Sequence, residues 1–206
     1  MMNEKMTAIL ILAAGNSSRL GKPKQLLHYK NNSLLENTIA EASSVPNTIV
    51  IVITGANQEL IQKEIQKEIQ NKSAIICHNP DWENGMSTSI ATGLNELLAL
   101  QPDIQKCILT VCDQPYLTSV VFEDLLKEYT KTGKGIIASS YSQTFGTPVL
   151  FDKKYFNALL ELKGQEGAKK IITKFLEDTA SISFEKGAID IDTIEDYNNL
   201  LDENLL

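Results

Sequence analysis

The stretch LAAGNSSRLGKPKQLL, from Leu12 to Leu27, follows an apolar run and contains two glycines and three cations. The apolar residues Thr7–Ala13 predict a buried strand, so the stretch is expected to form a long loop after the first strand of a sheet. Glycines let a backbone turn its N–H groups toward an anion, and neighbouring cations add charge. The pattern therefore predicts a phosphate-binding loop.

Two common phosphate-binding loops do not fit this stretch. A dinucleotide-binding turn needs GxGxxG, and Ser17 stands at the position of the second glycine. A P-loop needs four residues between its glycines, whereas five separate Gly15 from Gly21. It also needs a hydroxyl group after its lysine, and Pro23 has none. The loop is instead expected to hold a triphosphate through backbone N–H groups and its cations.

The distribution of charge supports an anion site in this segment. The formal net charge of the chain is −7, which argues against a nucleic-acid partner because such proteins need a broad basic face. From Lys5 through Leu35, however, there is no Asp or Glu, and the segment holds Arg19, Lys22 and Lys24. An acid-free segment with cations in an acidic chain indicates a site for a compact anion. A solvated basic surface loop is the alternative interpretation.

Length and composition indicate one soluble globular domain over residues 1–206, with 43% hydrophobic and 22% charged residues and no Pro/Gly/Ser-rich linker. The apolar runs are too short to span a membrane and no signal-peptide pattern is present, so a cytoplasmic location is expected. Cys77, Cys107 and Cys112 form no CxxC pair and lie among apolar residues. They are expected to be buried thiols in a reducing compartment.

Short β-rich runs alternate with longer helical patterns along the chain. The expected strands are Thr7–Ala13, Thr48–Thr54, Ala74–His78, Ile104–Val111 and Gly135–Ser140. The expected helices are Ser33–Ser44, which begins with a capping box of Ser33 and Glu36, Asn57–Gln70, Ser87–Leu100 and Thr118–Thr130. The later pattern predicts helices at Lys154–Leu162 and Ala168–Leu176 and short runs near Ser181–Phe184 and Ala188–Ile191. The alternation predicts an α/β fold with a mainly parallel sheet covered by helices.

Further motifs follow the loop: HNPDWENGMSTSI from His78, VCDQP from Val111, FGTPVLF from Phe145, LKGQEGAKKII from Leu162 and DIDTIEDY from Asp190. The loop itself resembles the pattern LAAGxSxRxGxPKxLL of the MobA-like NTP transferase family. With the other motifs, it most resembles the molybdenum cofactor cytidylyltransferases within that family. The resemblance extends over nearly the whole chain. It implies a single Rossmann-like three-layer domain of the nucleotide-diphospho-sugar transferase type.

The resemblance also implies an activity, the transfer of CMP from CTP to the phosphate of molybdopterin with Mg²⁺ as cofactor and pyrophosphate as product. The implied catalytic residues are Lys24, Arg19 and Asp113. The implied nucleotide-binding residues are Leu12, Ala13, Ala14, Gly15, Ser17, Arg19, Gly21, Lys22, Lys24, Asn79, Gly85, Ser87 and Ser89. A molybdoenzyme awaiting the cofactor is the implied protein partner. No membrane partner is expected, and no oligomeric state is indicated.

Three carboxylates are candidates for the metal site. Asp113 follows the apolar run CILTVC, so it lies at the carboxyl end of a predicted parallel strand, where open α/β sheets bind their ligands. A carboxylate there can hold Mg²⁺ against phosphate oxygens. Asp190 and Asp192 alternate along a short extended run and are expected on one face, so either can complete the site. Each carboxylate also has a purely structural interpretation. Asp113 can be a turn residue before Pro115, and Asp192 or Thr193 can cap the next helix.

The acceptor side departs from the family pattern. Gln165 stands where relatives commonly have an acidic residue, and Lys169 where they commonly have Arg. A related guanylyltransferase, or an enzyme with another phosphorylated acceptor, is therefore an alternative. A nucleotide-binding adaptor without turnover is another, although intact Lys24 and Asp113 favour an enzyme. Trp82 is expected to anchor its loop rather than to stack on a base.

Overall fold

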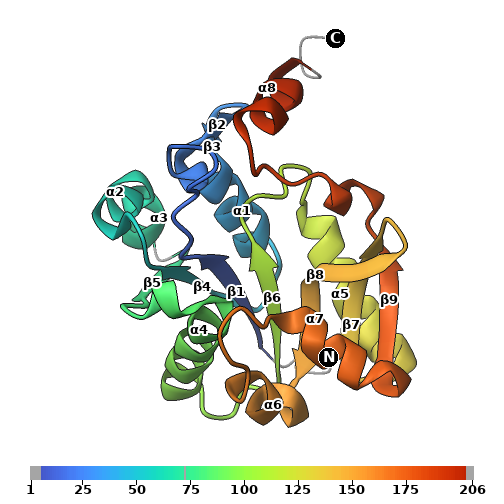
Figure 1. Cartoon of the computed structure of the whole chain (residues 1–206). Coiled ribbons are helices and arrows are strands. Elements are labelled where there is room, and N and C mark those ends of the chain that lie inside the picture. The colour runs from blue at the N-terminus through green and yellow to red at the C-terminus, as the bar shows by residue number, and fades with distance from the viewer. Residues whose placement is uncertain (1–5, 72, 203–206) are drawn as a thin grey trace.

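The computed structural model describes residues 6–71 and 73–202. Its main sheet has seven strands in the order β5-β4-β1-β6-β8-β7-β9 (Figure 1). The bounds are β1 (Thr7–Ala13), β4 (Thr48–Thr54), β5 (Ile75–His78), β6 (Lys106–Val111), β7 (Ile136–Tyr141), β8 (Thr144–Asp152) and β9 (Thr179–Ser183), with β2 (His28–Tyr29) and β3 (Asn32–Ser33) in a separate two-stranded sheet. Among the seven strands of the described residues, β8 alone runs antiparallel to its neighbours. The expected mainly parallel sheet is confirmed.

β1 lies inside the parallel part of the sheet, paired with β4 on one side and β6 on the other. Every residue of its sequence TAILILA is buried except Leu12, which is half-buried. Such a continuous apolar run is typical of a parallel strand covered on both faces. Its side chains alternate between two hydrophobic cores, with Ala8 and Leu10 in one and Ile9 and Ile11 in the other.

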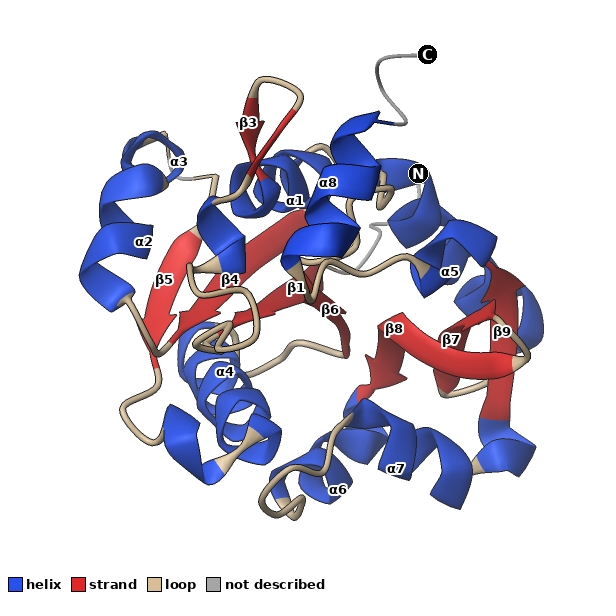
Figure 2. Cartoon of the chain, turned by 45° about the horizontal axis from the view of Figure 1, so that its top comes forward, coloured by secondary structure: helices blue, strands red, loops and turns tan. Residues whose placement is uncertain are grey.

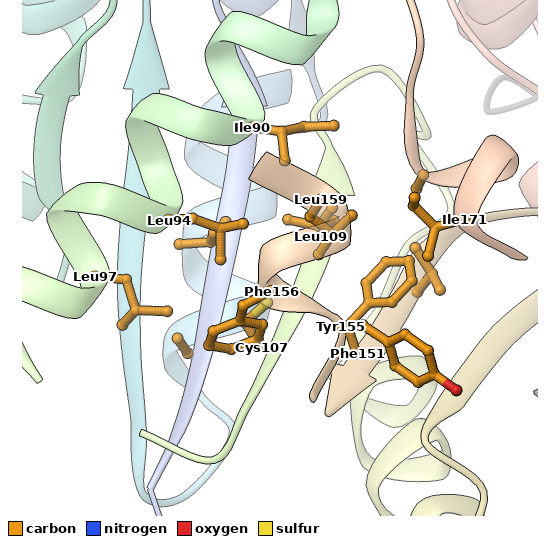
Figure 3. Close-up of a cluster of buried hydrophobic side chains, with 14 of the residues drawn as sticks. Ile90, Leu94, Leu97, Cys107, Leu109, Phe151, Tyr155, Phe156, Leu159 and Ile171 are labelled. Atoms are coloured by element: carbon orange, nitrogen blue, oxygen red, sulfur yellow. The ribbon is translucent and has the colours of Figure 1, made fainter. Parts of the chain in front are cut away.

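Helices cover both faces of the sheet and give the three expected layers (Figure 2). One face packs against α4 (Met86–Leu100), α6 (Phe156–Leu160) and α7 (Ala168–Lys174), and the other against α1 (Leu34–Ser43), α2 (Gln58–Glu64) and α5 (Ser119–Thr132). Figure 3 shows side chains of α4 and α6 gathered in the first of these cores. The remaining helices are α3 (Gln66–Gln70), α8 (Ile194–Asp202) and the 3-10 turns Lys24–Leu26, Trp82–Asn84, Lys153–Tyr155, Leu176–Asp178 and Glu185–Ala188. No helix in the described part of the chain is long and apolar enough to cross a membrane.

The order of the strands reverses between β1 and β6. After β1 the chain adds β4 and then β5 on one side of it, and it later returns to place β6 on the other side. At such a switch point the connections from the carboxyl ends of the two strands diverge and leave room for a ligand. These connections are the loop after Ala13, which holds the glycines and cations, and the segment that begins at Cys112.

A third and smaller hydrophobic cluster, here called the cap cluster, joins α8 to the loop that follows β1. Its buried members are Leu20, Leu27, Tyr29, Leu34, Ile191 and Leu200. The Tyr197 hydroxyl group adds a hydrogen bond of 2.7 Å to the carbonyl oxygen of His28. Residues 184–193, here called the C-terminal strap, lead from the end of β9 over the sheet to α8 (Figure 1). The strap and α8 therefore lie against the loop predicted to bind phosphate.

Some expected elements differ from the structure. The helix expected over Asn57–Gln70 is two helices, because the backbone of Ile65 has a ψ of 23° and breaks the helix there. β8 lies where no strand was expected, and its Gly146 and Pro148 weaken the strand pattern. The short run Ala188–Ile191 forms no strand and belongs to the C-terminal strap.

The cysteines differ in one respect from the expectation. Cys107 and Cys112 are buried thiols, as predicted, whereas Cys77 is only half-buried. Cys77 lies in β5, at the edge of the sheet, where one flank of the strand has no neighbouring strand among the described residues. Position at the sheet edge therefore explains the difference.

Candidate active site

The loop after β1 is held in shape by two polar side chains. Gln25 is buried, and its Nε2 donates to the carbonyl oxygens of Ala13, at 2.8 Å, and Gly15, at 2.9 Å. Ser17 has a φ of 54°, and its Oγ accepts from the backbone N–H of Lys24 at 3.0 Å. These bonds hold two carbonyl oxygens of the loop against Gln25 and fold the loop back on itself.

Two glycines keep this loop open. Gly15 and Gly21 are exposed, and a Cβ atom at either position would meet nothing within 4 Å. Gly21 has a φ of 72°, a conformation that favours glycine. The loop is thus free of packed side chains on the side that faces outward, as a triphosphate would require.

Lys24 is the centre of a charged cluster at the switch point. Its Nζ lies 2.5 Å from Oδ2 of Asp113 and 2.9 Å from Oδ1 of Asp192. Arg19 extends the cluster, with its guanidinium 2.7 Å from the other oxygen of Asp192. The structure therefore brings the predicted catalytic residues together with one of the two alternative metal ligands, from three segments of the chain.

The charges within this cluster shift the pKa values of its members. Burial alone would lower the pKa of the Lys24 ammonium group, but the charge of Asp113 and the hydrogen bonds to both carboxylates outweigh it and raise that pKa. Burial alone would raise the pKa of Asp192, but Lys24 and then Arg19 hold it below its ordinary value. Both groups are therefore charged at neutral pH.

Asp190 has a different environment from Asp192. Asp190 is an exposed residue of the strap, but its carboxyl group is partly desolvated. This desolvation, and then the negative charges of Asp113 and Asp192, raise the pKa of Asp190. The helix after the strap is capped by Thr193, whose Oγ1 accepts from the backbone N–H of Asp196 at 3.2 Å. Because Thr193 takes the capping role, the Asp192 side chain is available to the charged cluster.

Asn79, Ser89 and Thr88 form a compact hydrogen-bonded group behind the start of α4. The Nδ2 of Asn79 donates to Thr88 at 2.9 Å and to Ser89 at 3.0 Å. The Asn79 Oδ1 accepts from the N–H of Asp81, and the Thr88 hydroxyl group donates to the carbonyl oxygen of Asp81, both at 3.0 Å. Asn79 and Ser89 are buried. Their polar atoms therefore bind within the protein and fix the turn that leads into α4.

Gly85 and Ser87 lie at the start of α4 and touch the loop before α7. Gly85 has a φ of 111°, and a Cβ there would lie 2.3 Å from the carbonyl oxygen of Gly164. The backbone N–H of Ser87 donates to that same oxygen at 3.1 Å. Only glycine fits at position 85, so the two loops meet backbone to backbone.

Trp82 anchors its loop against the loop after β1. A Cβ on Gly55 would lie 2.6 Å from the Cβ of Trp82 and 2.8 Å from the carbonyl oxygen of Ala14. The glycine thus permits Trp82 to pack against the backbone of Gly55, close to the start of the loop after β1. This packing agrees with the expected role of Trp82 as an anchor.

The remaining predicted residues line the edge of the site or lie beside it. Leu12 and Ala13 end β1, and Ala14 is buried where the loop begins. Lys22 is exposed, with its Nζ 5.2 Å from the centre of the Tyr197 ring. Lys22 therefore lies apart from the contacts that Lys24 makes with carboxylates.

Sequence reasoning missed two residues that shape the site, Gln25 and Gln114. Each is buried and follows a residue of the charged cluster directly. The available signal was a glutamine directly after each of these charged residues.

A divalent cation fits the two carboxylates that meet at Lys24. No group of three His, Cys, Asp or Glu side chains is assembled as a metal site among residues 6–71 and 73–202. Asp113 and Asp192, however, converge on one point, where the Lys24 ammonium group stands as a cation between them. Two carboxylates plus phosphate and water oxygens are a donor set typical of Mg²⁺.

Known proteins resemble this chain in sequence and structure. It is 28% identical over 197 residues to the molybdenum cofactor cytidylyltransferase of Escherichia coli (strain K12). That alignment covers 93% of this chain and 95% of the other protein. It is also 28% identical over 204 residues to the nicotine blue oxidoreductase of Paenarthrobacter nicotinovorans, with coverage of 93% and 95%.

Solved structures share the whole fold. Rv0371c from Mycobacterium tuberculosis H37Rv matches with a TM-score of 0.81 at 24% identity, over 98% of this chain and 100% of that chain. A structure of the same protein in complex with manganese matches with a TM-score of 0.77 at 21% identity, over 96% and 99%. A model of the MobA-like NTP transferase domain matches residues 9–180, from β1 into β9. The chain, with its glycine-containing loop, its switch point and its lysine between two aspartates, therefore belongs to the MobA-like NTP transferase family.

Proposed function

We propose that this protein transfers CMP from CTP to the terminal phosphate of the molybdenum cofactor, molybdopterin, and releases pyrophosphate. The observation that carries this proposal is the Lys24 ammonium group held between Asp113 and Asp192 beside an open, glycine-containing loop. Such a site offers a cation for phosphate oxygens and two carboxylates for a metal ion. Similarity to the cytidylyltransferase over 93% of the chain supports the choice of nucleotide and acceptor.

The reaction requires positioning more than acid–base chemistry. A phosphate oxygen of the acceptor attacks the α-phosphorus of CTP and forms the new P–O bond. The bond from that phosphorus to the bridging oxygen breaks, and its electron pair leaves with pyrophosphate. Because the attacking oxygen is already an anion, no strong general base is needed. Lys24 donates hydrogen bonds to the α-phosphate, while Arg19, Lys22 and the loop N–H groups hold the β- and γ-phosphates.

Asp113 and Asp192 are the metal ligands in this proposal, with Asp190 as the alternative second ligand. When bound, Mg²⁺ would neutralise charge on the reacting and leaving phosphate oxygens. The manganese complex of Rv0371c supports a divalent cation in proteins of this fold. The resemblance to the family supports a base and ribose site at the start of α4, formed by Asn79, Gly85, Ser87 and Ser89.

The test is release of pyrophosphate with each of the four nucleoside triphosphates, with and without molybdopterin. We expect release with CTP that depends on molybdopterin and on Mg²⁺. Pyrophosphate release with GTP at a comparable rate would contradict the choice of CTP and leave the enzyme class intact. The preference for one base depends on only a few hydrogen bonds. No release under any condition would favour the nucleotide-binding adaptor instead.

An aspartate variant links the assay to the site. Asp113→Asn keeps the shape of the side chain and removes its charge, so it should lower turnover about 100-fold and raise the Mg²⁺ requirement. Asp103→Asn, at an exposed position after α4, is the matched control and should behave like the parent. Equal activity and equal Mg²⁺ dependence of parent and Asp113→Asn would make Asp113 a turn residue only.

A further inference from the structure

Gln114 is a buried amide directly after Asp113. Its side chain is 4% exposed, and its Nε2 donates to the carbonyl oxygens of Gly187, at 2.8 Å, and Thr147, at 3.2 Å. The hydroxyl group of Tyr141 lies 3.4 Å from the same nitrogen. The amide thus connects the segment after β6 with β8, β7 and the C-terminal strap.

The acceptors around this amide determine its orientation. The carbonyl oxygens of Gly187 and Thr147 face Nε2. If the amide were flipped, Oε1 would take the place of Nε2 and lie against these two oxygens with no hydrogen between them. The other atom, Oε1, is buried without a hydrogen-bond partner in the described structure. An apolar side chain of similar shape would fill the same space without an unsatisfied oxygen, so packing alone does not account for a glutamine here.

The strap begins where the N–H of Phe184 donates to the carbonyl oxygen of Ser140 at 3.0 Å, and near its other end Asp192 binds Lys24 and Arg19. Between these ends, two attachments lie one on each side of Asp190. At the first, Gly187 lies against aromatic rings: a Cβ there would lie 2.5 Å from Phe184 and 2.7 Å from Tyr141, so the backbone itself packs under them. This is the point that Gln114 binds. At the second, the N–H of Ile191 donates to the carbonyl oxygen of Asp113 at 2.9 Å.

We propose that Gln114 is a positioning residue, which sets the separation of the Asp113 and Asp192 carboxylates by holding the strap at Gly187. The two carboxylates belong to segments far apart in the chain, and beyond Phe184, whose N–H donates to Ser140 of β7, the strap joins no strand in the described structure. The side-chain bond at Gly187 and the backbone bond at Ile191 are therefore the contacts that guide the strap past Asp113, between the bond of Phe184 to Ser140 and the ion pairs of Asp192. The catalytic meaning of this separation rests on the proposed function.

The test compares Gln114→Met with Ser139→Ala. Met keeps the length of the side chain and removes the donor. Ser139 is a matched control because it is fully buried and donates to the carbonyl oxygen of Pro148 at 2.7 Å, a bond between β7 and β8 that does not reach the strap. Both variants lose buried side chain–backbone bonds in the same region: Gln114→Met loses those to Gly187 and Thr147, and Ser139→Ala loses the one to Pro148.

The first measurement is hydrogen exchange at the Ile191 amide, which needs no substrate. In Gln114→Met we expect exchange at Ile191 to be about tenfold faster, while amides inside β6 and β8 keep their protection. In Ser139→Ala we expect Ile191 to exchange as in the parent. Unchanged exchange at Ile191 in Gln114→Met, or the same increase in Ser139→Ala, would overturn the proposal.

The second measurement separates positioning from stability. At saturating nucleotide, Gln114→Met should lower kcat about tenfold and raise the half-saturating Mg²⁺ concentration, with little change in the KM for nucleotide. Ser139→Ala should lower the unfolding temperature without these kinetic changes. If Gln114→Met does not fold, Gln114→Asn, which is one methylene too short to reach Gly187, takes its place. A parent without activity contradicts the proposed function alone, because the exchange experiment still tests the strap.

Discussion

Lys24 and Lys30 belong to the same acid-free segment but have different surroundings. Lys24 binds two carboxylates at the switch point, whereas Lys30 is exposed, with its Nζ 5.2 Å from the centre of the Tyr29 ring. Lys24→Ala should therefore lower turnover about 100-fold, because a charge next to the reacting phosphate is lost. Lys30→Ala removes the same charge from the chain and should retain parental turnover. Equal rates of pyrophosphate release from the two variants would remove Lys24 from the catalytic group.

The cysteines should differ in reactivity. Burial, followed by the charge of Glu96, raises the pKa of Cys77, and burial raises the pKa of Cys112 to about 12. The thiolate is the reactive form, so a raised pKa leaves less of it at a given pH. A thiol reagent at pH 8 should therefore modify native Cys77 slowly, at a rate that still increases with pH above the ordinary thiol range. Cys107 and Cys112 should react only after unfolding, as peptide mapping of the labelled protein would show.

At the scale of an element, α1 begins with a complete capping box. The Ser33 hydroxyl oxygen accepts from the N–H of Glu36 at 3.2 Å, and the Glu36 carboxylate accepts from the N–H of Ser33 at 2.7 Å. Ser33→Ala should cost about 1 kcal/mol of unfolding free energy and lower the melting temperature by about 2–4 °C. Ser44→Ala, at the exposed other end of α1, is the control and should change stability by less than about 0.5 kcal/mol. Equal melting temperatures of the two variants would mean that the box does not stabilise α1.

The elements that could be predicted from sequence are those with local causes. β1 and β4 have the predicted bounds because uninterrupted apolar runs of strand length have few alternatives, and the box of Ser33 and Glu36 marked the start of α1. β8 was missed because its pairing with β6 and β7 depends on distant segments, while its own Gly146 and Pro148 argue against a strand.

The site shows the same division between local and distant causes. The loop and Asp113 could be recognised from sequence because each follows an apolar strand within a short motif. The sequence could not show that Asp192, rather than Asp190, is the partner of Lys24. That pairing depends on the path of the strap, and Asp192 is 168 residues from Lys24 in the chain. Gln114 was missed for a similar reason, since its acceptors come from three distant segments.

At the scale of the whole molecule, the cap cluster is separate from the two cores that hold the sheet. Leu200 is the buried side chain of α8, whereas Leu201 is 38% exposed. Leu200→Ala should reduce the stability of the cap by about 2–5 kcal/mol, and Leu201→Ala should have a much smaller effect. Hydrogen exchange should become faster at the amides of Leu20 and Leu27 while β1 and β4 remain protected. Uniformly faster exchange over the whole sheet would instead mean that cap and sheet unfold together.

The position of the strap along the chain has a consequence for biosynthesis. A ribosome makes the loop with Lys24 first and the strap with Asp192 only after every strand of the main sheet. A nascent chain can therefore fold its sheet and expose its phosphate loop while one of the two proposed metal ligands has not yet been synthesised. Nascent chains that are stalled before the strap is made should bind nucleotide weakly and should not hydrolyse or transfer it. Turnover of nucleotide would therefore begin only after the strap has left the ribosome.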